Sequence, residues 1–147
     1  MSRSTDEGQG FTAEERAAMK ERAAELRAAK KGKKSGLEDL LEKIEEMPDA
    51  DRVLAERLHV LVTESAPHLE PKSWYGMPAW ALDGKVLCFF QAAAKFNTPY
   101  ATFGFNEASA LMTDSMWVTG FGVATLTPDA EKQIVELVKK AAGTGTK

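Results

Sequence analysis

Three glutamates in this sequence have the type and spacing of a metal-binding row. Glu38, Glu42 and Glu45 recur at i, i+4 and i+7, which places their carboxylates on one face of a helix. Carboxylate oxygens are suitable ligands for hard cations, so an exposed row of them could hold iron weakly. Charges opposite an apolar stripe are also what an ordinary surface helix shows. We therefore expect a solvated helix face, with an iron-binding ridge as the alternative.

His59 and Cys88 also carry groups that could do chemistry. His59 follows Glu56 by three residues, but the neighbouring sequence offers no further metal donors, which favours a helix-surface histidine. Cys88 lies among apolar residues, where a cysteine usually behaves as a small buried hydrophobe; a nucleophile would need a base nearby. The sequence has no HExxH run, no paired cysteines and no glycine-rich phosphate loop. We predict no cofactor and favour a non-catalytic function, with an enzyme of unknown reaction as an alternative.

Eleven of the twelve aromatic residues fall between Trp74 and Phe121, so this half of the chain must hold most of the core. Such residues could instead line an apolar cleft for a small ligand or a protein partner, because small residues around them leave space. Ordinary core packing is the alternative interpretation. The predicted cleft residues are Trp74, Trp80, Phe89, Tyr100 and Trp117, with Tyr75 and Lys95 as polar contacts.

The same half of the chain favours β-strands, which are predicted at residues 72–82, 85–92, 100–105 and 116–126. Asp83-Gly84 readily takes the positive φ of a hairpin turn between the first two strands. A short helix is expected over residues 106–113. On the strand predicted over residues 72–82, Trp74 and Trp80 point to the same face, and both faces of the sheet are expected to be apolar. The second face then needs the N-terminal helix, a second subunit or a ligand to cover it.

Four helices are predicted from apolar periodicity and from residues that cap helix ends. Capping-box spacing occurs at Thr12–Glu15 and at Ser35–Glu38, Asp49 can cap the third helix, and Thr127-Pro128 begins the last. The second and third helices should form a hairpin. The apolar faces comprise Leu37, Leu40, Leu41 and Ile44, then Leu54, Leu58, Leu61 and Val62, and finally Ile134, Leu137, Val138 and Ala141. These elements predict an α+β domain, with an antiparallel sheet of about four to five strands and with the helical hairpin and the last helix packed on one face.

Residues 1–36 read as an extension of a domain that occupies residues 37–147. The extension carries nine Lys and Arg against six Asp and Glu, and its lysine-rich linker ends at Gly36. Its helix has only a thin apolar stripe of Met19, Ala23 and Leu26, which predicts weak docking. The whole chain of 147 residues has a net charge of −3, one cysteine and no long apolar run, which suggests a cytoplasmic protein without membrane or nucleic-acid partners.

A family resemblance rests on Tyr75-Gly76-Met77-Pro78-Ala79, followed by Gly84-Lys85, Phe89-Phe90 and Lys95. This order resembles the YdhG-like family of small bacterial domains of unknown function, over roughly residues 37–142. The resemblance implies a compact intracellular α+β domain, and some members are labelled frataxin-like iron chaperones. Phe96-Asn97-Thr98 stands where the family usually has a histidine-bearing segment. The expected function is therefore binding of a small ligand or partner through the aromatic sheet face, with a homodimer through that face as a further alternative.

Overall fold

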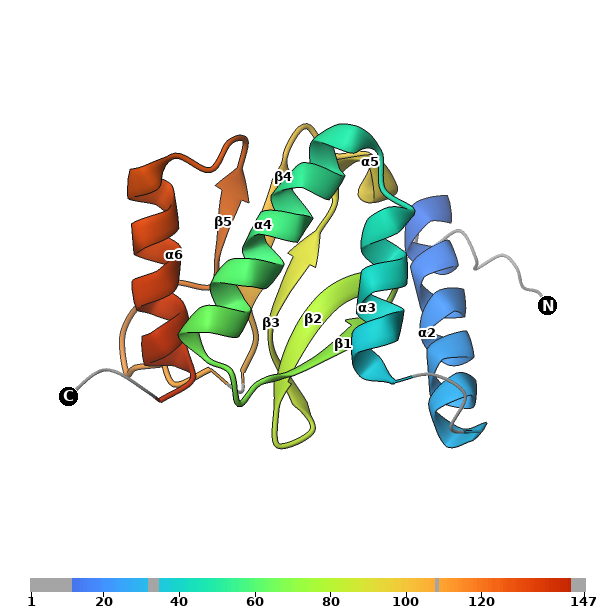
Figure 1. The fold of residues 1–147 in the computed structure, drawn as a ribbon, viewed down its shortest axis with the longest axis horizontal. Coiled ribbons are helices and arrows are strands. Elements are labelled where there is room, and N and C mark those ends of the chain that lie inside the picture. Colours follow the sequence, from blue (N-terminus) through green and yellow to red (C-terminus); the bar gives the residue numbers. More distant parts are fainter. Residues whose placement is uncertain (1–11, 32–34, 108, 144–147) are drawn as a thin grey trace.

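The fold is built on a five-stranded antiparallel sheet (Figure 1). The computed structural model describes residues 12–31, 35–107 and 109–143. Each strand pairs with its neighbour in the chain, so the order is β1-β2-β3-β4-β5. The strands are β1 (Glu70–Trp74), β2 (Met77–Leu82), β3 (Lys85–Gln91), β4 (Ala101–Phe105) and β5 (Gly120–Val123). The predicted α+β class is confirmed, at the upper end of the expected strand number.

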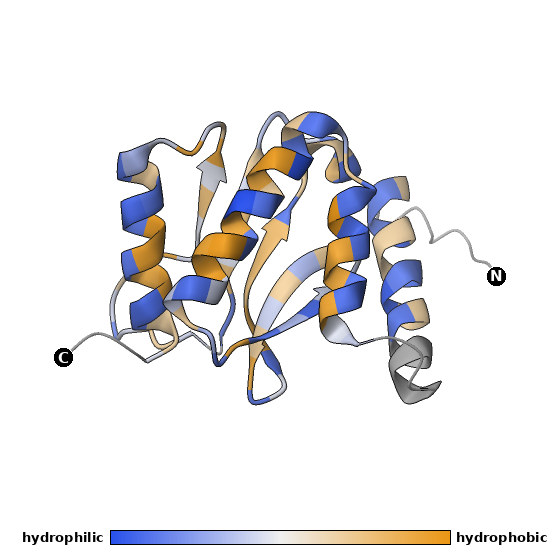
Figure 2. Ribbon diagram, in the orientation of Figure 1, coloured by the Kyte–Doolittle hydropathy of each residue, from blue (hydrophilic) through white to orange (hydrophobic). Residues whose placement is uncertain are grey.

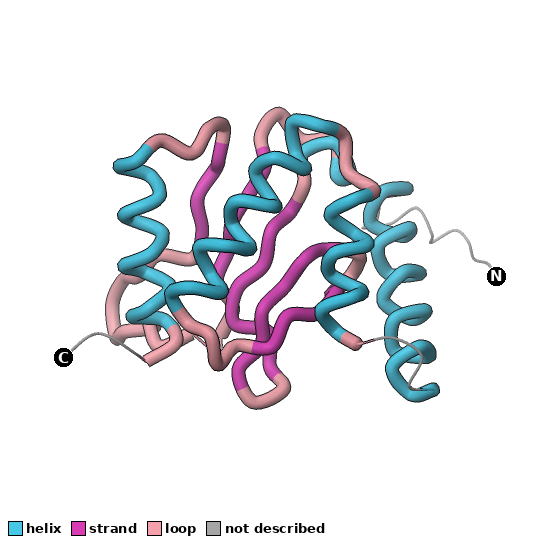
Figure 3. The backbone as a smooth tube through the Cα atoms, in the orientation of Figure 1, coloured by secondary structure: helices cyan, strands magenta, loops and turns pink. Residues whose placement is uncertain are grey.

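Three helices cover one face of this sheet, and a fourth lies at its β1 edge. Core residues of α3 (Gly36–Glu45), α4 (Asp49–Ser65) and α6 (Pro128–Ala141) pack with residues of the strands in one cluster. The long α2 (Ala13–Lys31) contacts β1 and α5 and lies at the opposite end of the molecule from α6 (Figures 1 and 3). A single-turn helix, α5 (Ala93–Phe96), follows β3 and was not predicted.

The predicted capping boxes begin α2 and α3. The Glu15 amide donates to Thr12 Oγ1 at 3.0 Å, and the Thr12 amide donates back to Glu15 Oε1 at 2.9 Å. Ser35 and Glu38 make the same reciprocal pair at 3.1 and 3.2 Å. These bonds satisfy backbone donors that a helix start otherwise leaves unpaired. Short-range sequence patterns therefore fix where both helices begin.

The predicted N-cap is correct for α6 and wrong for α4. Thr127 Oγ1 accepts from the Ala130 amide at 3.1 Å and begins α6 as predicted. The N-cap of α4 is Pro48, which has no side-chain oxygen to offer, and Asp49 is the first helical residue. Asp49 instead pairs with Arg52 at 2.7 Å. Its carboxylate still favours this helix end, through the helix dipole.

The core lies between the sheet and α3, α4 and α6. Its largest fully buried side chains include Trp80, Phe90 and Phe103 from the strands and Leu40 and Leu58 from the helices. Figure 2 shows strongly apolar residues along α3, α4 and α6, while the coloured part of α2 alternates between hydrophilic and weakly apolar residues. Burying each large apolar side chain contributes about 1.5–3 kcal/mol. The predicted stripes therefore supply most of the attachment, although Leu37 and Leu41 at their margins are exposed.

The single strand predicted over residues 72–82 is wrong, because a tight turn divides it. Tyr75 and Gly76 have φ values of 54° and 77°, the paired positive values of a type I′ hairpin turn. Trp74 consequently pairs with Met77, while Trp80 pairs with Pro71. Since side chains alternate along β2, Trp74 and Trp80 lie on opposite faces of the sheet. The second hairpin, at Asp83-Gly84, is confirmed, with φ values of 52° and 84°.

The segment between β4 and β5 differs from its prediction. Residues 106–107 and 109–119 contain turns and bends but neither a helix nor a strand, and β5 covers only the middle of the predicted fourth strand. The expected helix over residues 106–113 is therefore wrong for the described part of that range. None of the helices within the described ranges is both long and apolar enough to cross a membrane.

Candidate functional site

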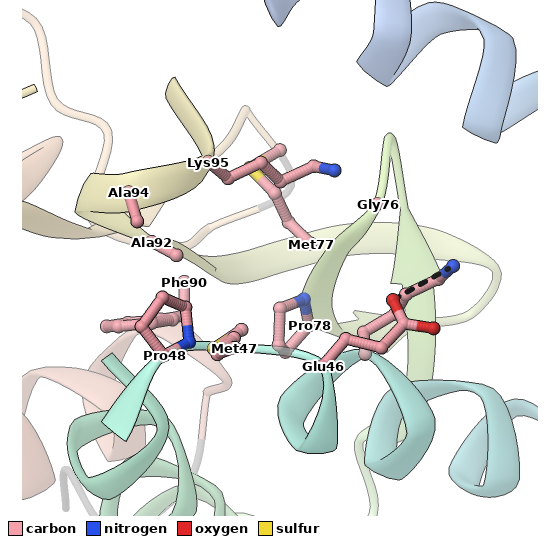
Figure 4. A pocket seen from close by; sticks show the side chains of 11 residues that line it. Glu46, Met47, Pro48, Gly76, Met77, Pro78, Phe90, Ala92, Ala94 and Lys95 are labelled. Carbon is pink, nitrogen blue, oxygen red and sulfur yellow. Dashed lines mark ion pairs between the residues drawn. The ribbon is translucent and has the colours of Figure 1, made fainter. Parts of the chain in front are cut away.

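A pocket of about 220 Å³ opens where the end of α3, the start of β2 and α5 meet (Figure 4). Its walls are mostly apolar and include Met47, Pro48, Met77, Pro78 and Phe90. The remaining lining residues are Lys43, Glu46, Gly76, Ala92, Ala94 and Lys95. An apolar hollow with a few charged groups at its edge is the usual character of a small-molecule site.

The hairpin turn at Tyr75-Gly76 builds one wall of this pocket. It turns the chain so that Gly76, Met77 and Pro78 face α3 and α5 rather than continuing along β1. A Cβ atom on Gly76 would lie 1.8 Å from Glu21 Oε1 and 2.7 Å from Lys95 Cε. Both the positive φ and this crowding require glycine at this position. The turn therefore positions the pocket wall and brings α2 and α5 against it.

A buried carboxylate holds α5, which carries Lys95. Asp51 on α4 is 5% exposed, and its two oxygens accept from the amides of Ala93 and Ala94, each at 3.1 Å. These amides are among the unpaired donors at a helix start, so Asp51 serves as a cap from a distant part of the chain. This role of Asp51 was not predicted from the sequence. The available signal was its position four and seven residues before Ala55 and Leu58, in line with the buried face of α4.

The two lysines of the pocket each have a carboxylate partner. Lys95 Nζ donates to Glu21 Oε1 of α2 at 2.5 Å, with both side chains about one-third exposed. Lys43 Nζ lies 3.9 Å from Glu46 Oε1 on the same helix. In Figure 4, Lys95 extends from α5 toward the turn that carries Gly76. The pocket thus presents two cations at its rim, and both are neutralised by neighbouring glutamates.

The face of α2 that meets the domain is polar rather than the predicted apolar stripe. Ala18, Glu21, Arg22 and Glu25 lie at i, i+3, i+4 and i+7, and Ala18 and Glu25 are buried. Met19 and Ala23 of the expected stripe are exposed. The side chain of Leu26 and the linker residues 32–34 lie outside the described part of the chain. Charge, not apolar area, therefore provides most of the contacts seen on this face.

Glu25 and Arg22 complete the contact between α2 and the turn. Glu25 Oε2 accepts from the Gly76 amide at 3.0 Å, while its buried Oε1 has no hydrogen bond and lies 3.7 Å from Arg22 Nη1. The Arg22 guanidinium stands 5.8 Å from the centre of the Tyr75 ring. Burial, and then the nearby Arg22 charge, lower the pKa of Lys72 below its usual value. The charged form of Lys72 is therefore less favoured here than in water.

The aromatic residues predicted to share one cleft do not lie together. The rings of Trp74 and Phe89 make a tilted contact, with centroids 5.4 Å apart, on the face opposite α3, α4 and α6, where Phe89 covers Gly104. Trp80 lies in the core on the other face, and Tyr100 and Trp117 are 52% and 41% exposed. Trp74 also meets Tyr75 edge-on at 5.1 Å. Of the seven predicted ligand contacts, Lys95 is the member that lines the 220 Å³ pocket.

His59 has a structural partner that the sequence did not reveal. Trp80 Nε1 donates to His59 Nδ1 at 3.2 Å, and the two rings stack with an interplanar angle of 24°. His59 is thus half-buried rather than the surface histidine expected, and burial lowers its pKa below the ordinary value. The neutral His59 ring can accept a hydrogen bond from the indole N–H of Trp80. Pairing satisfies the polar atom of a tryptophan that is otherwise fully buried.

The other reactive groups support no site in the described residues. Within residues 12–31, 35–107 and 109–143, no three His, Cys, Asp or Glu side chains are grouped to hold a metal ion. In the predicted acidic row, the Glu38 carboxylate accepts the Ser35 amide of its capping box. Cys88 is fully buried, as predicted, and burial raises the pKa of its thiol far above the usual value. The thiol therefore stays protonated and is a poor nucleophile.

Comparisons of the chain with protein-family models, with curated proteins and with solved structures found no match.

Proposed function

We propose that this protein is a non-catalytic binding protein whose ligand is a small molecule with an apolar body and an acidic group. The observation that carries the proposal is the position of Lys95 at the rim of an apolar pocket formed by Met47, Met77 and Phe90. Apolar walls favour the body of a ligand, and an ammonium group orients a carboxylate or phosphate.

The dimensions of the pocket limit the ligand. Its volume of about 220 Å³ is below the roughly 300–1,000 Å³ usual for drug-sized ligands. A short-chain carboxylate is the kind of molecule that fits both the size and the charge. The titratable groups of the lining are Lys43, Glu46 and Lys95, and both lysines are paired with carboxylates, which suits recognition better than proton transfer.

The family resemblance is compatible with this location, and membership of the YdhG-like family is part of the proposal. Gly76, Met77 and Pro78 belong to the motif that carries the resemblance, and Lys95 is its last residue. All four line the same pocket. Binding at this pocket would explain why a motif without catalytic groups combines a turn, two apolar residues and a distant lysine.

A titration with hexanoate tests the proposal, with hexanol as a neutral ligand of similar size. We expect saturable shifts of the Gly76 and Ala94 amides in NMR spectra, with a dissociation constant on the order of millimolar. Lys95→Met should weaken hexanoate binding about tenfold, because a hydrogen bond to a charged group contributes about 1.5–3 kcal/mol. Hexanol binding should change little. Lys132→Met removes an exposed charge on α6 and is the matched control. If hexanoate causes no saturable shift at these amides, the proposed site is wrong.

A second candidate is a protein partner that binds the sheet face opposite α3, α4 and α6. It is favoured by the contact between the Trp74 and Phe89 rings and by Tyr100, which is half-exposed above Gly122. Aromatic residues on an accessible face are common anchors of protein interfaces. Dimerisation through this face would make stability depend on protein concentration, which denaturation at two concentrations would detect.

A further inference from the structure

The attachment of α2 uses the same groups that the pocket offers to a ligand. Lys95 and Gly76 line the pocket, and both are bonded to α2, through Glu21 and Glu25. Glu21 Oε1 lies so close to Gly76 that a single added carbon there would overlap it. The Glu21 carboxylate is therefore already paired with the Lys95 ammonium group that an acidic ligand would need.

Little else among the described contacts holds α2 in place. Ala18 is the one apolar side chain buried in the part of α2 whose side chains are described, residues 13–25, and Met19 is 42% exposed. Salt bridges between partly exposed groups contribute only about 0–1 kcal/mol. The buried Glu25 adds a charge-assisted bond to Gly76 but leaves one oxygen without a hydrogen bond. An attachment of this kind can be displaced by a competing anion.

We propose that α2 is an internal competitor for the pocket: Glu21 imitates the acidic group of the ligand on Lys95, so that ligand binding and α2 docking oppose each other. This inference rests on the proposed function, since it concerns the same pocket. Because coupling between two binding events is reciprocal, a ligand that takes Lys95 must loosen α2 to the same extent that α2 weakens the ligand. The polar face of α2 would then become accessible when the pocket holds a ligand.

The test compares the full chain with Glu21→Ala and with Glu14→Ala as the matched control. Both substitutions remove one carboxylate from α2 and introduce the strongest helix former, but Glu14 makes none of the contacts described above. We expect Glu21→Ala to tighten hexanoate binding by about two- to fivefold, the range that a partly exposed ion pair can supply. Glu14→Ala should match wild type. Hydrogen exchange of the amides of residues 16–25 should accelerate when hexanoate saturates the wild-type protein.

The possible outcomes separate this inference from the proposed function. If hexanoate binds wild type and Glu21→Ala equally, and α2 amides exchange at the same rate with and without it, the pocket is a site but α2 does not compete for it. If hexanoate binds neither protein at Gly76 and Ala94, the proposed function fails and the competition fails with it. Tighter binding in Glu21→Ala together with faster exchange of α2 in wild type supports both.

Discussion

Two helices of this protein meet the rest of the fold with the same spacing and opposite chemistry. The face of α4 uses Ala55, Leu58 and Val62, which are fully buried against the sheet. The face of α2 uses Ala18, Glu21, Arg22 and Glu25 at i, i+3, i+4 and i+7. Apolar burial is non-directional and is not screened by ions, whereas ion pairs are screened and can be exchanged. The comparison distinguishes a helix held by the apolar core from one held by charged contacts.

Replacing Trp80 by Ala should have the largest effect, because it removes a fully buried side chain from the apolar interface. We expect a loss of about 3–5 kcal/mol in the free energy of unfolding, the usual cost of deleting a core aromatic. Urea denaturation at two protein concentrations measures it.

Trp117→Ala is the matched control, since Trp117 is 41% exposed and should cost less than about 1 kcal/mol. A loss at Trp80 as small as the control would show that the sheet-facing interface is not the main source of stability. A dependence on protein concentration would instead indicate a subunit interface.

A substitution at Gly76 tests whether α2 is held through the turn that contains this residue. Gly76→Ala should be destabilising by about 1–2 kcal/mol from its positive φ alone. The added carbon would also push Glu21 and Lys95 apart, because it would lie 1.8 Å from Glu21 Oε1. We therefore expect hydrogen exchange in α2 to rise toward that of a free helix, while amides of α4 keep most of their protection.

Gly84 provides the control for this change. Its φ of 84° imposes a similar backbone cost, but a Cβ atom there meets nothing within 4 Å. Gly84→Ala should therefore lower stability without accelerating exchange in α2. Equal exchange in the two variants would mean that α2 is not held through the Gly76 turn.

Sequence patterns predicted the local and periodic parts of the fold. The capping boxes at Thr12 and Ser35 and the turn at Asp83-Gly84 depend on residues a few positions apart, so they can be read directly. The buried faces of α4 and α6 follow from helical periodicity. Tyr75-Gly76 was missed because tyrosine seldom adopts positive φ, and its neighbours favour a continuous strand.

The candidate site was much harder to predict than the fold. Its contacts join residues far apart in sequence, as in Asp51 with Ala93, Glu21 with Lys95 and Glu25 with Gly76. No periodicity or spacing encodes such pairs. The expected aromatic cleft depended on placing Trp74 and Trp80 on one face, and a single unrecognised turn separated them. Lys95 was predicted as a polar contact of the aromatic cleft, but its partners became visible only in the tertiary structure.

The smallest expected effect concerns the polar contact within the apolar interface, between His59 and Trp80. Burial lowers the pKa of His59 below 6.5. The folded protein therefore favours the neutral ring, which accepts the hydrogen bond from Trp80 Nε1. As the pH falls below 6.5 the unfolded chain takes up a proton that the folded protein does not, until the lowered pKa is reached. Stability from this group is therefore complete above about pH 6.5, declines as the pH falls toward the folded-state pKa, and levels off below it.

His59→Asn isolates this effect, because Asn Oδ1 can accept from Trp80 at nearly the same position and does not titrate. We expect the free energy of unfolding of wild type to fall more steeply than that of the variant between pH 7.5 and pH 5.5, measured by urea denaturation in one buffer series. All other titratable groups are the same in both proteins, so the difference between the two curves reports His59. Parallel curves would mean that the His59 ring is protonated as readily in the folded protein as in the unfolded chain. The contact between His59 of α4 and Trp80 of the sheet would then not make stability depend on pH. The interface of α4 with the sheet would differ even more from the charged face of α2.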